Sequence, residues 1–307
     1  MALEMPVVRA LSRRSDPRGT LRYGGHLAAM ASTACLIWLA FDNVWLLIPA
    51  LFVHGFTIVT MFAPMHECVH KTAFKTPWLN DAFGWLAGAL CFYNFTYYRR
   101  YHTWHHRYTQ DEQFDPELET PKPANRWQYA LHISGLPFWW HKPIELVTMS
   151  IGRQRYPYVP EQSRSVVAWS ARAQLGLYLL LAAGSAWFQT TVVWWYWLLP
   201  AILAQPLLRA ILIVEHTGCS QDTNGLTNTR TTLASRPVRF LMWNMPFHAE
   251  HHLYPSITFF CLPQAHQELQ SRLAHIAPSY PRANREVIRG LSAAGSANEQ
   301  AQADAVV

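Results

Sequence analysis

HTWHH, at residues 102–106, is the stretch from which the fold of this chain can be worked out. Two similar motifs flank it, HECVH at residues 66–70 and HAEHH at residues 248–252. We call them motif one (66–70), motif two (102–106) and motif three (248–252). On a helix, spacings of three and four residues place side chains on one face. Each motif therefore predicts a helix that presents its histidines in one direction.

The number of histidines in the three motifs predicts a site for two metal ions. Neutral imidazole is the commonest metal ligand in proteins, and one ion takes at most four ligands in a tetrahedral site or six in an octahedral one. Iron is favoured over zinc, because structural zinc closes at four ligands and catalytic zinc usually keeps three. Eight of the fifteen histidines are ligand candidates on this basis: His66, His70, His102, His105, His106, His248, His251 and His252.

Two other interpretations use the same residues. Motif one alone fits the HExxH pattern of zinc proteases, with Glu67 as the general base. A membrane zinc hydrolase of that kind would tolerate changes at His105 or His251. A non-enzymatic metal-binding receptor or transporter would instead need polar residues in several membrane spans. The stretches of this chain that could span a membrane are almost wholly apolar.

The ordered motifs resemble those of the integral-membrane fatty acid desaturase superfamily, which includes lipid hydroxylases and carotenoid oxygenases. The similarity includes YYRRYHTWHHRYTQ at 97–110 and NMPFHAEHHLYPS at 244–256, and it covers about residues 60–265. The resemblance implies a di-iron centre with O2 as co-substrate. It also implies His216 as a ninth ligand, since an extra histidine between motifs two and three commonly completes the set. Leu212 replaces the asparagine of the acyl-CoA branch, which argues against that branch.

Composition and hydropathy predict an all-α integral membrane protein with a substantial polar part. Only 14% of the 307 residues are charged, whereas 50% are apolar. Four apolar stretches are long enough to cross a hydrocarbon core of about 30 Å, and we expect them to form two hairpins. The segment 82–93 is too short to span and is expected to be re-entrant or interfacial. The predicted spans are residues 23–41, 44–65, 166–188 and 192–214.

The rest of the chain is expected to form one domain with these spans. Residues 1–22, with five arginines, are predicted to be a polar, flexible N-terminal arm. Residues 66–165 and 215–290 would form a helical cap that carries the motifs, within a single domain at 23–290. The low-complexity segment 291–307 is predicted to be a disordered tail.

The basic residues predict the orientation of the chain in the membrane. No Lys or Arg occurs between residues 27 and 70, whereas residues 71–165 contain eleven. The positive-inside rule therefore places the N-terminus and the motifs on the cytoplasmic side. The net charge of +6 is not gathered into one stripe, so nucleic acid is not an expected partner. The five cysteines indicate no disulfide framework.

Supporting residues around the site can also be nominated. A ligating histidine needs an acceptor for its second ring nitrogen. An apolar slot beside the site could admit a lipid chain from the bilayer, with Trp104, Trp243 and Phe247 as candidate walls. The candidate acceptors are Glu67, Asp111, Asp115, Glu215, Asp222 and Glu250.

The predicted reaction is oxidation of an unactivated methylene, which needs a redox metal because acid-base groups cannot ionise such a bond. The resemblance favours desaturation of an acyl chain; hydroxylation or ketolation of a lipid or carotenoid is the alternative. The sequence contains no flavin or NAD fingerprint, so an external donor is expected: a ferredoxin, rubredoxin or cytochrome b5-like protein with its reductase. The basic face that includes Arg99, Arg100 and Arg107 is a candidate docking surface.

Overall fold

The computed structural model describes residues 2–291, which are mostly helical. The predicted tail lies outside the described residues except for residue 291. The elements are α1 (Met5–Leu11), α2 (Asp16–Ala40), α3 (Val44–Val59), α4 (Phe62–Val69), α5 (Pro77–Leu90), α6 (Phe95–Tyr108), η1 (Pro116–Leu118), α7 (Arg126–Ile133), α8 (Leu136–Ser150), α9 (Glu161–Trp187), η2 (Trp194–Leu198), α10 (Leu199–Leu212), β1 (Thr231–Thr232), α11 (Arg236–Leu241), α12 (His248–Leu253), α13 (Leu262–Leu269) and β2 (Ile276–Ala277).

Four helical segments of the described chain are long and apolar enough to cross a membrane, as predicted. They are Asp16–Ala40, Val44–Val69, Glu161–Trp187 and Trp194–Leu212. The first begins earlier than expected because the Ser15 side chain accepts a hydrogen bond from Arg18 N, and a proline occupies the first turn. The second combines α3 and α4, so it continues directly into motif one.

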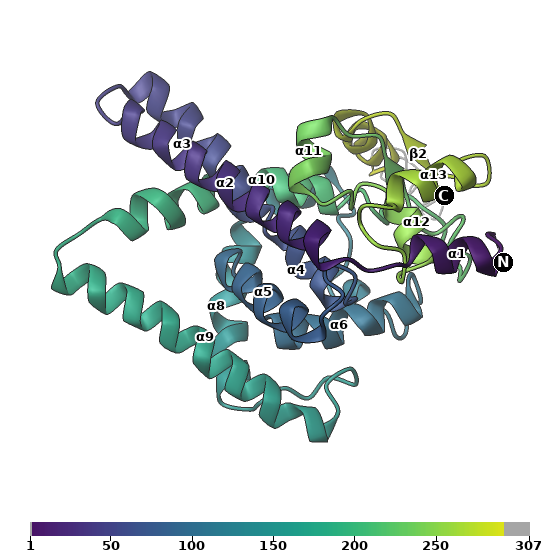
Figure 1. Ribbon diagram of the computed structural model, residues 1–307, viewed down its shortest axis with the longest axis horizontal. Coiled ribbons are helices and arrows are strands. Elements are labelled where there is room, and N and C mark those ends of the chain that lie inside the picture. Colours follow the sequence, from purple (N-terminus) through teal and green to yellow (C-terminus); the bar gives the residue numbers. More distant parts are fainter. Residues whose placement is uncertain (1, 292–307) are drawn as a thin grey trace, which may run out of the picture.

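The spans differ in how they pack. α2 and α10 both lie against α3 (Figure 1). The α3–α10 contact is close, because a Cβ added to Gly55 would lie 2.0 Å from the Pro200 carbonyl oxygen. α9 packs on α6 and α8 instead, and Figure 1 shows it diverging from α10 beyond the 188–193 connection. Apolar side chains of α9 such as Leu180 and Trp187 are exposed, and they would contact lipid if this helix spans the bilayer.

The N-terminal segment differs from the flexible arm that we predicted. Residues 5–11 form α1 and residue 16 already belongs to α2. Leu3, Val8 and Leu11 are buried in a cluster with side chains from α13 and the 247–257 region. Leu3 N donates to the Tyr254 hydroxyl at 2.6 Å, and Thr258 N donates to Leu11 O at 3.3 Å. These long-range contacts hold the N-terminal segment beside motif three. The charge of residues 1–22 could not predict this position.

The segments that carry the motifs pack together at one end of the spans. α4 lies against α5 and α6, and α12 lies against α13 and β1 (Figure 1). The two-residue strands β1 and β2 pair in parallel, with Thr231 opposite Ile276. The predicted short segment 82–93 forms most of α5, which has 14 residues and is not among the candidate spans. The arrangement brings motifs that are far apart in sequence onto neighbouring helices.

Candidate metal centre

The histidines of the three motifs meet in the interior, on helices that begin and end at defined residues. His66 lies in α4 and His70 is its C-cap residue. Motif two lies in α6, which begins where the Asn94 side chain accepts a hydrogen bond from Tyr97 N at 3.0 Å. Motif three forms α12, and His216 follows α10.

Five imidazoles form the first group, which we call site A. Its ligand atoms all lie within 4.8 Å of one another, so the group could hold a metal ion. His106 Nε2 is 3.0 Å from His102 Nε2 and 3.1 Å from His251 Nε2. The members are His66, His70, His102, His106 and His251.

The contacts within site A fit a metal ion better than they fit a hydrogen-bonded core. Both ring nitrogens of His66, as well as Nε2 of His70, are buried without a hydrogen-bond partner, and buried polar atoms of a folded protein normally have one. Two imidazole nitrogens bound at right angles to one ion, each at about 2.1 Å, would lie about 3.0 Å apart. The separations of His106 from His102 and His251 match that value.

Three imidazoles form the second group, site B: His105, His216 and His252. His105 Nε2 lies 3.2 Å from His216 Nε2, and His252 Nε2 is buried without a partner. The two sites are adjacent, because the His106 ring of site A stacks on the His252 ring with centroids 4.0 Å apart. Two ions bound in these sites would be neighbours.

His248 belongs to neither group but lies beside both. Its ring centroid is 4.5 Å from that of His252 and 5.9 Å from that of His251. Its Nδ1 is buried without a partner, whereas Nε2 lies 3.4 Å from a Glu215 carboxylate oxygen. The structure therefore brings all nine predicted ligands together and distributes eight of them over two sites.

The protein environment keeps most of these imidazoles neutral, which is the form that binds metal. Outside the candidate spans, burial, with repulsion from neighbouring histidines, lowers the pKa of seven of them. His105 is the exception: burial alone would lower its pKa, but Glu117 and Asp115 outweigh burial and raise it. The seven are His70, His102, His106, His216, His248, His251 and His252.

Two of the nominated carboxylates contact candidate ligands at close range: Asp115 contacts His105 of site B, and Glu215 contacts His248. Asp115 is buried, and its Oδ1 lies 2.8 Å from His105 Nδ1. A carboxylate only accepts, so Nδ1–H donates and the Nε2 lone pair points into the site. Glu215 reaches His248 instead, and burial together with repulsion from Glu117 raises the pKa of Glu215.

The other four nominated carboxylates act elsewhere. Glu67 accepts from the Thr72 hydroxyl at 2.7 Å and stays 3.7 Å from His66 Nδ1. Glu250 accepts hydrogen bonds from Thr231 and His266, which connects motif three to β1 and α13. The remaining two stabilise loops: Asp111 accepts from the Gln113 and Phe114 backbones, and Asp222 accepts from Asn224 N and the Thr227 hydroxyl.

Several supporting residues were not predicted. The Gln110 amide donates to His216 O at 2.7 Å, and Gln110 N donates to Asp115 at 2.8 Å. Thr109 lies 3.2 Å from His252 Nδ1, and Glu117 lies 3.8 Å from His105 Nε2. Their position just after motif two was the available signal. The sequence could not show which of these residues contact the ligands, because the contacts depend on the turn at Gln110, whose φ is +65°.

The three aromatic residues predicted to line a lipid slot occupy different places. Trp243 is fully buried and packs against Tyr23 and Phe259. Phe247 lies in the cluster that holds the N-terminal segment. Only Trp104 borders a described cleft, between α6 and α9. The packing of the first two indicates structural cores rather than channel walls.

Comparison with known proteins finds similarity to desaturases. A family model described as fatty acid desaturase matches residues 10–283. An sn-1 oleoyl-lipid 12-desaturase of Picosynechococcus is 26% identical over 80% of this chain and 75% of its own length. A protein of the same description from Synechocystis is 28% identical over 74% of the chain and 69% of its length. The dihydrorhizobitoxine desaturase of Bradyrhizobium elkanii is 27% identical over 78% and 70%.

Proposed function

The chain belongs to the fatty acid desaturase family, and from that premise we propose that it is an O2-dependent, di-iron membrane desaturase that introduces a C=C bond into the acyl chain of a lipid. The observation that carries the proposal is the pair of adjacent histidine groups, sites A and B, with buried nitrogens that lack partners. Two iron ions, when bound, would supply the activation of O2 that removal of hydrogen from an unactivated methylene requires.

The overall reaction sets what the protein must provide. Loss of two hydrogens from neighbouring carbons supplies two electrons and two protons, whereas reduction of O2 to two waters takes four of each. Two further electrons and two protons must therefore come from outside. We propose a ferredoxin, rubredoxin or cytochrome b5-like donor with its reductase as the source of these electrons.

The proposed tasks of the protein residues are holding and orienting. Nine histidines would hold the two ions: the eight of sites A and B, and His248 between them. Asp115 fixes the tautomer of His105 through the 2.8 Å contact, and Gln110 ties the His216 backbone to the same loop. Because these groups are buried, little reorganisation is needed when an ion binds.

We propose that the four candidate spans form two hairpins, with the N-terminus and the metal centre in the cytoplasm. The absence of Lys and Arg at 27–70 and their number at 71–165 support this orientation. A lipid substrate would then reach the cytoplasmic cap from the inner leaflet. The relatives described as acting on oleoyl-lipid favour an acyl lipid over a carotenoid, and Leu212 in place of asparagine argues against an acyl-CoA.

The test is lipid mass spectrometry of bacterial cells that express the wild type, His102→Ala or His141→Ala. His141 is an exposed histidine of α8 and serves as the control. We expect a product two mass units lighter than an abundant acyl chain with the wild type and the control, and none with His102→Ala. A product sixteen mass units heavier would mean that the reaction is hydroxylation and not desaturation. One zinc and no iron per purified chain would overturn the di-iron proposal.

A further inference from the structure

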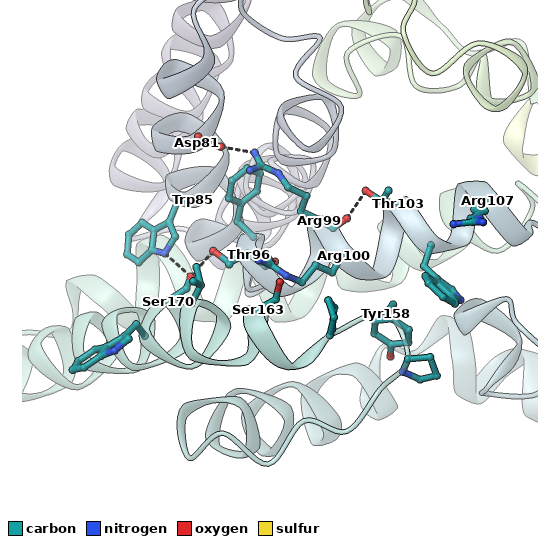
Figure 2. Close-up of a pocket in the computed structure, with 16 residues that line it drawn as sticks. Asp81, Trp85, Thr96, Arg99, Arg100, Thr103, Arg107, Tyr158, Ser163 and Ser170 are labelled. Atoms are coloured by element: carbon teal, nitrogen blue, oxygen red, sulfur yellow. Dashed lines mark hydrogen bonds and ion pairs between the residues drawn. The ribbon is translucent and has the colours of Figure 1, made fainter.

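A cleft of about 990 Å³ lies on the side of α6 that faces away from the metal centre. Helical spacing puts Arg100, Thr103 and Arg107 on the face opposite His102 and His105. The other wall is the first part of α9, from Ser163 to Ser170, and α5 closes one end (Figure 2). The cleft therefore lies where a candidate span begins.

The cations in this cleft are not equivalent. Arg99 forms an ion pair with Asp81 at 2.5 Å. Arg100 is partly buried and donates to the Thr96 carbonyl at 2.6 Å, and among the described residues it forms no ion pair. Burial lowers the pKa of Arg100, so the charged guanidinium is held at a desolvation cost. Arg107 also has no carboxylate partner in the described part of the chain.

Neutral groups complete a surface that is polar at one side and apolar at the other. The Ser163 hydroxyl forms no hydrogen bond within residues 2–291 and faces the same space as Arg100 (Figure 2). Trp85 and Trp169 line the apolar side, and Trp169 is 67% exposed. Tryptophan is favoured at the level of lipid headgroups, where its ring contacts chains and its N–H stays near water.

We propose that this cleft binds the headgroup phosphate of an anionic membrane phospholipid, with Arg100 and Ser163 on the phosphate, Arg107 beside it, and acyl chains along Trp85 and Trp169. The bound lipid is not the substrate, because α6 separates it from the histidines. A protein electron donor fits less well. Its surface would meet the rim at Arg107, whereas Arg100 is recessed and Arg99 is already neutralised by Asp81.

The experiment uses full-length protein reconstituted into nanodiscs with equal amounts of phosphatidylglycerol and phosphatidylcholine. After release into mild detergent, native mass spectrometry counts the lipids retained per chain. We expect one retained phosphatidylglycerol on the wild type. Arg100→Gln should lower its retention about tenfold, the loss expected for one charge-assisted hydrogen bond. Arg107→Gln, at a more exposed position, should lower it about threefold.

Controls separate this proposal from its competitors. Arg285→Gln removes the same charge from an exposed site in the helix at 280–291 and should leave retention unchanged. His102→Ala should still retain much more lipid than Arg100→Gln does, so failure of the desaturase proposal would not imitate failure of this one. The proposal is overturned if the Arg100 and Arg107 variants retain lipid as Arg285→Gln does. It is also overturned if millimolar inorganic phosphate displaces the lipid, or if only the KM for a ferredoxin changes.

Discussion

Asp115→Asn should weaken metal binding at site B and spare site A. The Asp115 carboxylate is 4% exposed and contacts only one candidate ligand, His105, at 2.8 Å. Removing its charge leaves the size of the side chain almost unchanged. The variant therefore tests whether a charged acceptor at Nδ1 sets the ligand strength of His105.

The expected magnitude follows from that contact. A hydrogen bond to a charged partner contributes about 1.5–3 kcal/mol, and loss of such partners in metal sites typically lowers affinity about 10- to 100-fold. Titration of the apo-protein with Fe²⁺, followed by iron analysis after desalting, should give about one retained ion per chain in place of two. Activity in the lipid mass spectrometry assay should also fall about 10- to 100-fold.

Asp111→Asn is the matched control, because Asp111 accepts from the Gln113 and Phe114 backbones and contacts no histidine. Asp115 also accepts from the Gln110 and Glu117 backbones, so thermal unfolding must be measured on both variants. Equal iron content and activity in folded Asp115→Asn and Asp111→Asn would refute the role of the carboxylate. Loss of both ions together would instead mean that the two sites bind as one unit.

Three further changes test other parts of the structure. His216→Ala should leave about one iron per chain by elemental analysis, and two retained ions would remove this residue from the ligand set. Leu11→Ala should lower the free energy of unfolding by about 2–4 kcal/mol, because Leu11 is 3% exposed in the N-terminal cluster; an unchanged unfolding curve in detergent would mean that the segment is not docked. Gly55→Ala should lower the free energy of unfolding by about 3 kcal/mol or more, since its Cβ would lie 2.0 Å from the Pro200 carbonyl oxygen. Gly176→Ala, with no atom within 4 Å, should leave thermal unfolding unchanged or slightly raised, and an equal loss in both variants would refute the close α3–α10 contact.

The four candidate spans and the eight histidines of the motifs could be identified from the sequence because both depend on local patterns, whereas His216 came from the family resemblance. Apolar length predicts a crossing whatever the rest of the chain does, and the spacing within 102–106 holds on any helix. The distribution of ligands over two sites is not local. His251 and His252 are neighbours in α12, yet they belong to sites A and B, and this depends on how α12 is rotated against α6.

The unpredicted contacts depend on turns and on distant partners. Six carboxylates near the motifs were equally good candidates, and the turn at Gln110 selects Asp115 by bringing it back to His105. The N-terminal segment was misjudged for a related reason. Val8 and Leu11 are apolar at helical spacing and Leu3 precedes their helix, but five arginines dominate the composition of residues 1–22. The surface that buries the three apolar side chains comes from residues 247–269.

The two faces of α6 connect the metal centre with the proposed lipid site. His102 and His106 contribute to site A and His105 to site B, so a rotation of α6 about its axis would move ligands of both sites at once. α6 is also held to α9 by the hydrogen bond from Thr96 to Ser170 at 2.8 Å, and to α5 by the Arg99–Asp81 pair. A phospholipid that binds between Arg100 and Ser163 would add a third restraint between α6 and α9. Iron affinity of both sites should therefore be higher in phosphatidylglycerol nanodiscs than in phosphatidylcholine ones, and the Arg100→Gln variant should lose that difference.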